Sequence, residues 1–259
     1  GHTGKPGNES PTQTYFNVKG GLTCISAKGL KFNDVYDALK KRHFYAVTGQ
    51  DRILLNFEFQ ADNKIYSMGD LLTGSVKDGV VNLEAFSSTP IQWVKIYKNL
   101  KVVEEFYPGA KEEEKIQVLY SGSNSKGRER NYTWKGKLIS SSNITKLEKI
   151  NFIPHRTGLY QTGTELEWNG LTSGNVQGFT FAGEDSDLHI DLNGQKINAN
   201  TQHLGQKPQI IKYEGINSYL SICKIYENQL NKKMKITSSI DSFDDDYNAL
   251  YAEVRLING

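Results

Sequence analysis

The stretch ILLNFEF, residues 53–59, decides the fold class of this chain, because its side chains alternate between apolar and polar. Leu55 and Phe57 fall on one face, and Asn56 and Glu58 fall on the other. A period of two residues is the signature of a half-buried β-strand. The stretch therefore predicts a strand with one face against a core and one face toward water.

The same alternation recurs on both sides of a long intervening segment. Residues 81–85 and 91–99 continue it, with Asn99-Leu100 as a hairpin tip, and residues 233–240 and 247–257 resume it near the far end. The strands between 50 and 110 suffice for one sheet but are too few to close a sandwich. We therefore expect one immunoglobulin-like β domain made of residues 50–121 plus 229–259.

Residues 122–228 carry strand signals of their own. The polar run SGSNSKGRER, residues 121–130, is typical of an entry linker, and Asn193-Gly194 predicts a two-residue hairpin turn. A domain inserts into another at low entropic cost where the ends of the host loop are close. We expect an inserted β-sandwich or jelly-roll of about eight strands.

A helix is predicted before the first strand, in FNDVYDALKKRHFYAVTG, residues 32–49. Phe32, Tyr36 and Leu39 follow the apolar spacing of an amphipathic helix, and Asn33 is placed to cap it. The simplest interpretation is a short surface helix packed on a sheet. The fold class expected for the whole chain is thus mostly β with one short N-terminal helix.

Composition limits the classes of function. The chain has 259 residues, a formal net charge of +2, 14 Tyr and 11 Phe. Nearly balanced charge favours neither nucleic acid nor an anionic membrane as a partner, and no apolar run is long enough for a membrane helix. The two cysteines, Cys24 and Cys223, are too few for a disulfide scaffold. Cellular location is not indicated, and both a cytoplasmic and an exported bacterial protein fit.

Several motifs together resemble the C-terminal end of PHP-type (polymerase and histidinol phosphatase) proteins, and more closely a bacterial group often labelled a domain of unknown function. The motifs are, in chain order, GHTGKPG, GGLT, ALKKRHFYAVTG, RILLNFEF, YSMGD, RNYTWKGKLI, LEWNGLTSGNVQGFTF and YNALYAEVRLING. The resemblance implies that residues 1–49 are the end of a PHP-like domain. It also implies a further strand after residue 259, and hence an exposed edge that can pair with a neighbour in a dimer.

PHP-type proteins are thought to bind divalent metals, Zn, Mn or Fe, in a distorted barrel and to hydrolyse phosphoesters. His2 matches the histidine of a late Asp-x-His ligand pair, but the early His-x-His motif is absent, since no two of the five histidines are two residues apart. One ligand does not make a useful metal site, because such sites need three or four. We therefore expect no catalytic residue and no cofactor in this chain, and a metal only in a longer parent protein.

Other candidate sites are weaker. His155 and Arg156 form a basic pair in a loop, where they can face an anionic ligand. His189 lies between Asp187 and Asp191 at alternate positions, but a flat strand face does not enclose an ion, so a solvated face is favoured. The acidic segment 241–246 lacks the glycine and the trailing Glu of a calcium loop. The three tryptophans are expected in packing, and the run KEEEK, residues 111–115, in a solvated loop.

Three hypotheses follow. The favoured one is a non-catalytic accessory β region of a PHP-like metallohydrolase, with the missing catalytic domain as its partner. The alternative is a β-sandwich module that binds carbohydrate or another ligand, an analogy at the level of fold alone. A third is an enzyme whose missing ligands come from another chain.

Overall fold

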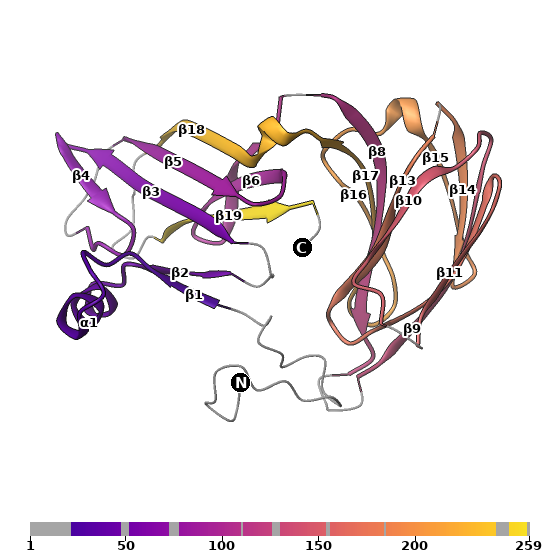
Figure 1. The fold of residues 1–259 in the computed structure, drawn as a ribbon, viewed down its shortest axis with the longest axis horizontal. Coiled ribbons are helices and arrows are strands. Elements are labelled where there is room, and N and C mark those ends of the chain that lie inside the picture. Colours follow the sequence, from indigo (N-terminus) through magenta and orange to yellow (C-terminus); the bar gives the residue numbers. More distant parts are fainter. Residues whose placement is uncertain are drawn as a thin grey trace. The chain divides into compact units, whose positions relative to one another are not determined.

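The computed structural model describes residues 22–47, 52–72, 78–109, 111–125, 130–153, 156–183, 185–241 and 249–257 (Figure 1). Within these residues the chain is mostly antiparallel β-structure with one α-helix. Contacts divide the chain into two compact units, residues 1–110 with 228–259 and residues 111–227. The first unit therefore contains segments from both sides of the second.

The first unit contains a β-sandwich of two antiparallel sheets. Its four-stranded sheet has the order β18-β5-β3-β4, formed by β3 (Ile53–Ala61), β4 (Lys64–Ser67), β5 (Gly79–Ser87) and β18 (Lys233–Ile240). Its three-stranded sheet has the order β19-β6-β7, formed by β6 (Ile91–Lys98), β7 (Lys101–Phe106) and β19 (Leu250–Leu256). The 3-10 turn η3 (Gln229–Lys232) precedes β18. Constant-type immunoglobulin domains also divide into sheets of four and three strands. The order of the strands within each sheet differs here from the order in those domains.

The core of the first sandwich lies on the faces that alternation predicts. Phe57 and Phe59 of β3 are buried, and so are Val81, Leu83 and Ala85 of β5. Strands from both ends of the chain pair directly: the ladder between β19 and β6 sets Ala252 opposite Ile96. The predicted hairpin tip is confirmed, because Asn99 and Leu100 both have positive φ, 50° and 67°.

A small βαβ segment precedes this sandwich. It consists of β1 (Leu22–Ile25), α1 (Phe32–Lys40) and β2 (Phe44–Val47), and β1 pairs with β2 in antiparallel fashion. The expected cap was wrong by two residues: the N-cap is Lys31, whose carbonyl accepts from the Val35 N–H at 3.1 Å. No side chain caps the helix, so Asn33 lies in its first turn.

The second unit is a sandwich of two five-stranded antiparallel sheets, two strands more than expected. One sheet has the order β10-β13-β8-β17-β16, formed by β8 (Glu113–Ser123), β10 (Thr145–Ile150), β13 (Val176–Ala182), β16 (Gln209–Lys212) and β17 (Ile216–Glu227). The other has the order β11-β12-β9-β14-β15, formed by β9 (Tyr132–Ser140), β11 (Gly158–Thr162), β12 (Glu165–Thr172), β14 (Asp187–Leu192) and β15 (Gln195–Asn200). The 3-10 turn η2 (Thr201–His203) follows β15.

One expected boundary is corrected by β8. The expected first domain includes residues 111–121, but β8 is the central strand of a sheet in the second unit, between β13 and β17. The acidic start of this strand suggested a loop, whereas Ile116, Val118 and Tyr120 are buried in the second core. The polar run 121–130 begins inside β8, whose last residues are 121–123, so it is not an entry linker.

Aromatic rings fill the core of the second sandwich. Trp134 and Trp168 are buried, and the Trp168 ring meets Phe179 edge-on at 5.0 Å between centroids. The Trp134 Nε1–H donates to Thr172 Oγ1 at 2.8 Å. Trp134 and Trp168 therefore have the packing role that the sequence predicted.

Candidate interaction surface

The structure describes only part of the predicted sites. His2 and His155 lie outside the described residues, so the metal-ligand and anion-binding predictions made for them stay predictions. Arg156 is exposed, and its backbone N–H donates to the Ile153 carbonyl at 3.2 Å. Within the part of the chain that is described, no cluster of three or more His, Cys, Asp or Glu side chains is arranged to hold a metal ion.

The polar side chains around His189 have separate partners. His189 Nδ1 lies 2.7 Å from Asn198 Oδ1, and Asn200 Nδ2 donates to Asp187 Oδ1 at 2.7 Å. Asp191 Oδ1 accepts from the Gly194 N–H of the hairpin turn. These contacts run between strands and do not converge on a common point, in agreement with the solvated face that the sequence favoured.

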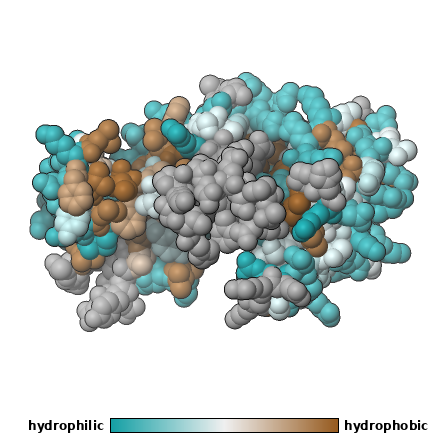
Figure 2. Space-filling view, turned by 60° about the horizontal axis from the view of Figure 1, so that its bottom comes forward, coloured by the Kyte–Doolittle hydropathy of each residue, from teal (hydrophilic) through white to brown (hydrophobic). Residues whose placement is uncertain are grey.

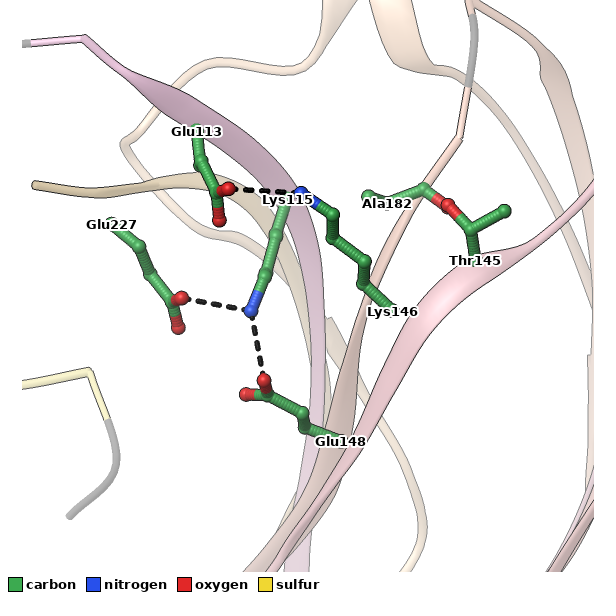
Figure 3. Close-up of polar contacts among 7 residues, drawn as sticks. All are labelled: Glu113, Lys115, Thr145, Lys146, Glu148, Ala182 and Glu227. Atoms are coloured by element: carbon green, nitrogen blue, oxygen red, sulfur yellow. Dashed lines mark hydrogen bonds and ion pairs between the residues drawn. The ribbon is translucent and has the colours of Figure 1, made fainter.

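A charge network on the second unit is structural. Lys115 is only 3 % exposed, and its Nζ contacts Glu148 Oε1 at 3.0 Å and Glu227 Oε2 at 2.8 Å (Figure 3). Burial lowers the pKa of Lys115, but hydrogen bonds to the two carboxylates outweigh that effect and raise the pKa above its ordinary value. The network joins β8, β10 and β17, and it corrects the solvated loop expected for this lysine.

The most unusual surface belongs to the βαβ segment, residues 22–47. Among its side chains, Leu30 is 99 % exposed and Phe32 79 % exposed. Five further large apolar side chains of the segment are exposed: Leu22, Ile25, Tyr36, Leu39 and Phe44. Only Ala38 and Val47 are buried among its apolar residues. In the space-filling view, hydrophobic residues gather on the surface of the first unit, at the left (Figure 2).

The predicted apolar stripe of α1 exists, but it does not face a core. Phe32 and Tyr36 lie one turn apart and stack at 5.7 Å between ring centroids, with an interplanar angle of 11°. The Lys40 ammonium lies over the Tyr36 ring at 4.7 Å. Phe32, Tyr36 and Leu39 are all exposed, so the stripe forms an outward-facing apolar strip along the helix.

Polar contacts join this segment to the sandwich. Arg42 Nε donates to the Gly69 carbonyl at 2.9 Å, and His43 Nε2 lies 3.3 Å from Asp70 Oδ1. The Ser67 N–H donates to the other Asp70 oxygen at 2.8 Å. Burial opposes ionisation of Asp70, but the Ser67 N–H and His43 together lower the pKa of this carboxyl below its ordinary value.

Basic residues outnumber acidic ones in the segment that carries the apolar strip. Residues 22–47 contain five basic side chains, Lys28, Lys31, Lys40, Lys41 and Arg42. They contain only two acidic ones, Asp34 and Asp37. The surface therefore combines exposed aromatic and aliphatic groups with an excess of positive charge, a combination that suits a protein partner with an apolar and acidic face. Sequence reasoning identified the stripe but placed it against a sheet of this chain.

Comparison with known proteins gives no family assignment: no protein-family model matches the sequence, and no curated protein is similar to it. Within the described parts of the chain, no helix combines the length and apolar character needed to cross a membrane.

Proposed function

We propose that this chain is a non-catalytic accessory β region of a PHP-like metallohydrolase with phosphoesterase-like chemistry. In this proposal, residues 22–47 pack on the catalytic domain of the longer parent protein. The divalent metal, Zn, Mn or Fe, belongs to that domain. The observation that carries the proposal is the exposure of seven large apolar side chains within residues 22–47.

The physical support comes from the balance of burial in this segment. A two-stranded hairpin is marginally stable by itself and needs a further strand or a packed helix. Here the helix contributes one buried residue, Ala38, and turns its aromatic strip outward. Full burial of a side chain such as Phe32 stabilises by about 1.5–3 kcal/mol. A covering domain supplies the burial that residues 22–47 lack.

The experiment is a binding measurement between this chain and a PHP-like catalytic domain supplied as a separate polypeptide. The double variant Phe32→Ser/Tyr36→Ser is expected to weaken the complex by about tenfold or more, since two aromatic contacts are lost. The matched control is Ile65→Ser on β4, which is 64 % exposed and lies outside the segment. Equal affinities for the wild type, double variant and control would contradict the proposal, as would the absence of a complex.

The alternative function, a carbohydrate- or ligand-binding β-sandwich module, requires exposed aromatic side chains grouped on one sandwich face. Among the described residues of the second unit, Tyr160 is the one large aromatic side chain that is exposed. Tyr160 lies on the edge strand β11. A single ring at an edge gives this function less support than the seven grouped side chains give the docking function.

A further inference from the structure

A groove lies within the first unit, between the β1–β2 hairpin and the outer face of the four-stranded sheet. Its volume is about 640 Å³, which falls within the range of small-molecule sites. Cys24 and Tyr45 line the groove from the hairpin, whereas Leu54, Phe86 and Lys233 line it from the sheet. This groove is separate from the aromatic strip on α1, none of whose side chains lines it.

The floor of the groove is apolar although it belongs to the solvent face of a sheet. Leu54 and Phe86 lie directly opposite each other on β3 and β5. Their exposed fractions are 66 % and 53 %, because the neighbouring residue Ala85 takes the core side of β5. An exposed pair of large apolar side chains at adjacent strand positions offers a flat contact for an apolar ligand.

Tyr45 fixes the wall of the groove. Its hydroxyl donates to the Ile53 carbonyl at 2.6 Å and accepts from the Leu55 N–H at 3.3 Å, so the hairpin is tied to β3 at the edge of the groove. Burial raises the pKa of Tyr45, which keeps the phenol neutral and able to donate. Cys24 is paired with Tyr45 in the hairpin register. The groove is thus formed before any ligand arrives, as is usual for ligand sites.

Lysines outnumber carboxylates at one side of the groove, where Lys233 and Lys235 lie near Glu84. Lys235 Nζ contacts Glu84 Oε1 at 2.8 Å, and this contact lowers the pKa of Glu84. Lys233 follows next to the apolar pair, opposite Phe86 in the ladder of β18 and β5. The Lys233 charge also contributes to the lowered pKa of Glu84, so two lysines face one carboxylate here. An ammonium beside an apolar floor favours a ligand that is both apolar and anionic.

We propose that this groove binds a small amphipathic organic anion. Its aliphatic or aromatic body lies on Leu54 and Phe86, and its carboxylate or sulfonate lies near the Lys233 ammonium. The groove shares Ile25 with the docking surface proposed above, but it includes none of the α1 strip and needs no partner domain.

The test uses the full chain and two fluorescent probes of similar shape, the anionic 8-anilinonaphthalene-1-sulfonate and the neutral N-phenyl-1-naphthylamine. Phe86→Ala is expected to weaken binding of both probes by about tenfold, because the apolar floor is lost. Lys233→Gln is expected to weaken only the anionic probe, by about threefold, the effect of one exposed charge. All titrations are performed in the Phe32→Ser/Tyr36→Ser background, so that the α1 strip does not bind the probe.

Two control variants complete the test. Ile65→Ala and Lys101→Gln change an exposed apolar and an exposed basic side chain outside the groove, and both are expected to leave the titrations unchanged. Unchanged probe affinities in Phe86→Ala would place the probe elsewhere and overturn the site. Equal weakening of both probes by Lys233→Gln would overturn the anionic part of the proposal. Thermal unfolding of each variant separates a lost site from a lost fold.

Discussion

Residues 22–47 and the second sandwich use apolar side chains in opposite ways. In the second sandwich, 17 hydrophobic residues form one buried cluster between two sheets. In residues 22–47, seven large apolar side chains are exposed while two apolar residues are buried. A segment of the first kind supplies its own stabilisation, whereas one of the second kind needs an external surface. This difference in burial is the basis for proposing residues 22–47 as a docking surface.

The largest expected effect separates the two regions directly. Trp168→Ala is expected to destabilise the second sandwich by about 3–5 kcal/mol, the cost of removing a buried aromatic side chain. Phe32→Ala should change the stability of the isolated chain by less than about 0.5 kcal/mol, because its ring is mostly in water. Chemical denaturation followed by tryptophan fluorescence and far-UV circular dichroism measures both. Similar losses of unfolding free energy in both variants would contradict the contrast between the two regions.

A smaller effect is expected at a glycine within the same aromatic core. A Cβ at Gly170 would overlap the Tyr120 ring, so Gly170→Ala should destabilise by about 1–3 kcal/mol through overpacking. Gly109→Ala is the control, since a Cβ there meets no atom within 4 Å. Denaturation midpoints of the two variants check the prediction, which is wrong if Gly170→Ala unfolds at the same midpoint as Gly109→Ala.

The buried lysine offers a matched pair of charge deletions. Lys115→Met leaves Glu148 and Glu227 without their shared cation and is expected to cost about 1–2 kcal/mol, since both carboxylates are partly solvated. Lys146→Met breaks an exposed pair with Glu113 and should cost less than about 1 kcal/mol. Urea denaturation of each variant measures the difference. An equal cost would show that burial of Lys115 has no energetic consequence.

The smallest effect concerns the attachment of residues 22–47. The pKa of Asp70 is lowered in the folded chain, so its contribution is present above the unfolded pKa and is lost as pH falls through the folded value. Below about pH 4 we expect lower amide protection in β1 and β2, relative to the intrinsic exchange rate at each pH. The loss in opening free energy should be no more than ~1 kcal/mol, the contribution of an exposed ion pair. Asp70→Asn should remove the pH dependence while the second sandwich stays protected. Persistence of the pH dependence in Asp70→Asn would exclude this anchor.

Local patterns predicted the strands and turns well. The alternation in residues 53–59 identified the buried face of β3, and the Asn193-Gly194 turn has the positive φ values, 52° and 84°, that a two-residue hairpin requires. These features depend on neighbours in sequence. The boundary at β8 failed because this strand begins with the exposed Glu113 and Glu114, and its partner strands β13 and β17 are dozens of residues away in sequence. The order of strands in the sheets and the charge network at Lys115 both depend on such distant pairing.

The sequence predicted the apolar side of the candidate surface but not its exposure. The spacing of Phe32, Tyr36 and Leu39 showed that α1 has an apolar side. The spacing could not show whether the covering surface lies in this chain, because amphipathicity describes one partner of a contact. The groove beside Tyr45 was missed for a related reason: Leu54 and Phe86 are far apart in sequence and become neighbours only through the register of β3 and β5.

The most direct test of the docking claim is hydrogen–deuterium exchange of this chain, alone and with a PHP-like catalytic domain. We expect amide protection to rise across β1, α1 and β2, residues 22–47, while residues 111–227 exchange as in the isolated chain. Unchanged exchange in residues 22–47 when the catalytic domain is present at saturating concentration would contradict the account.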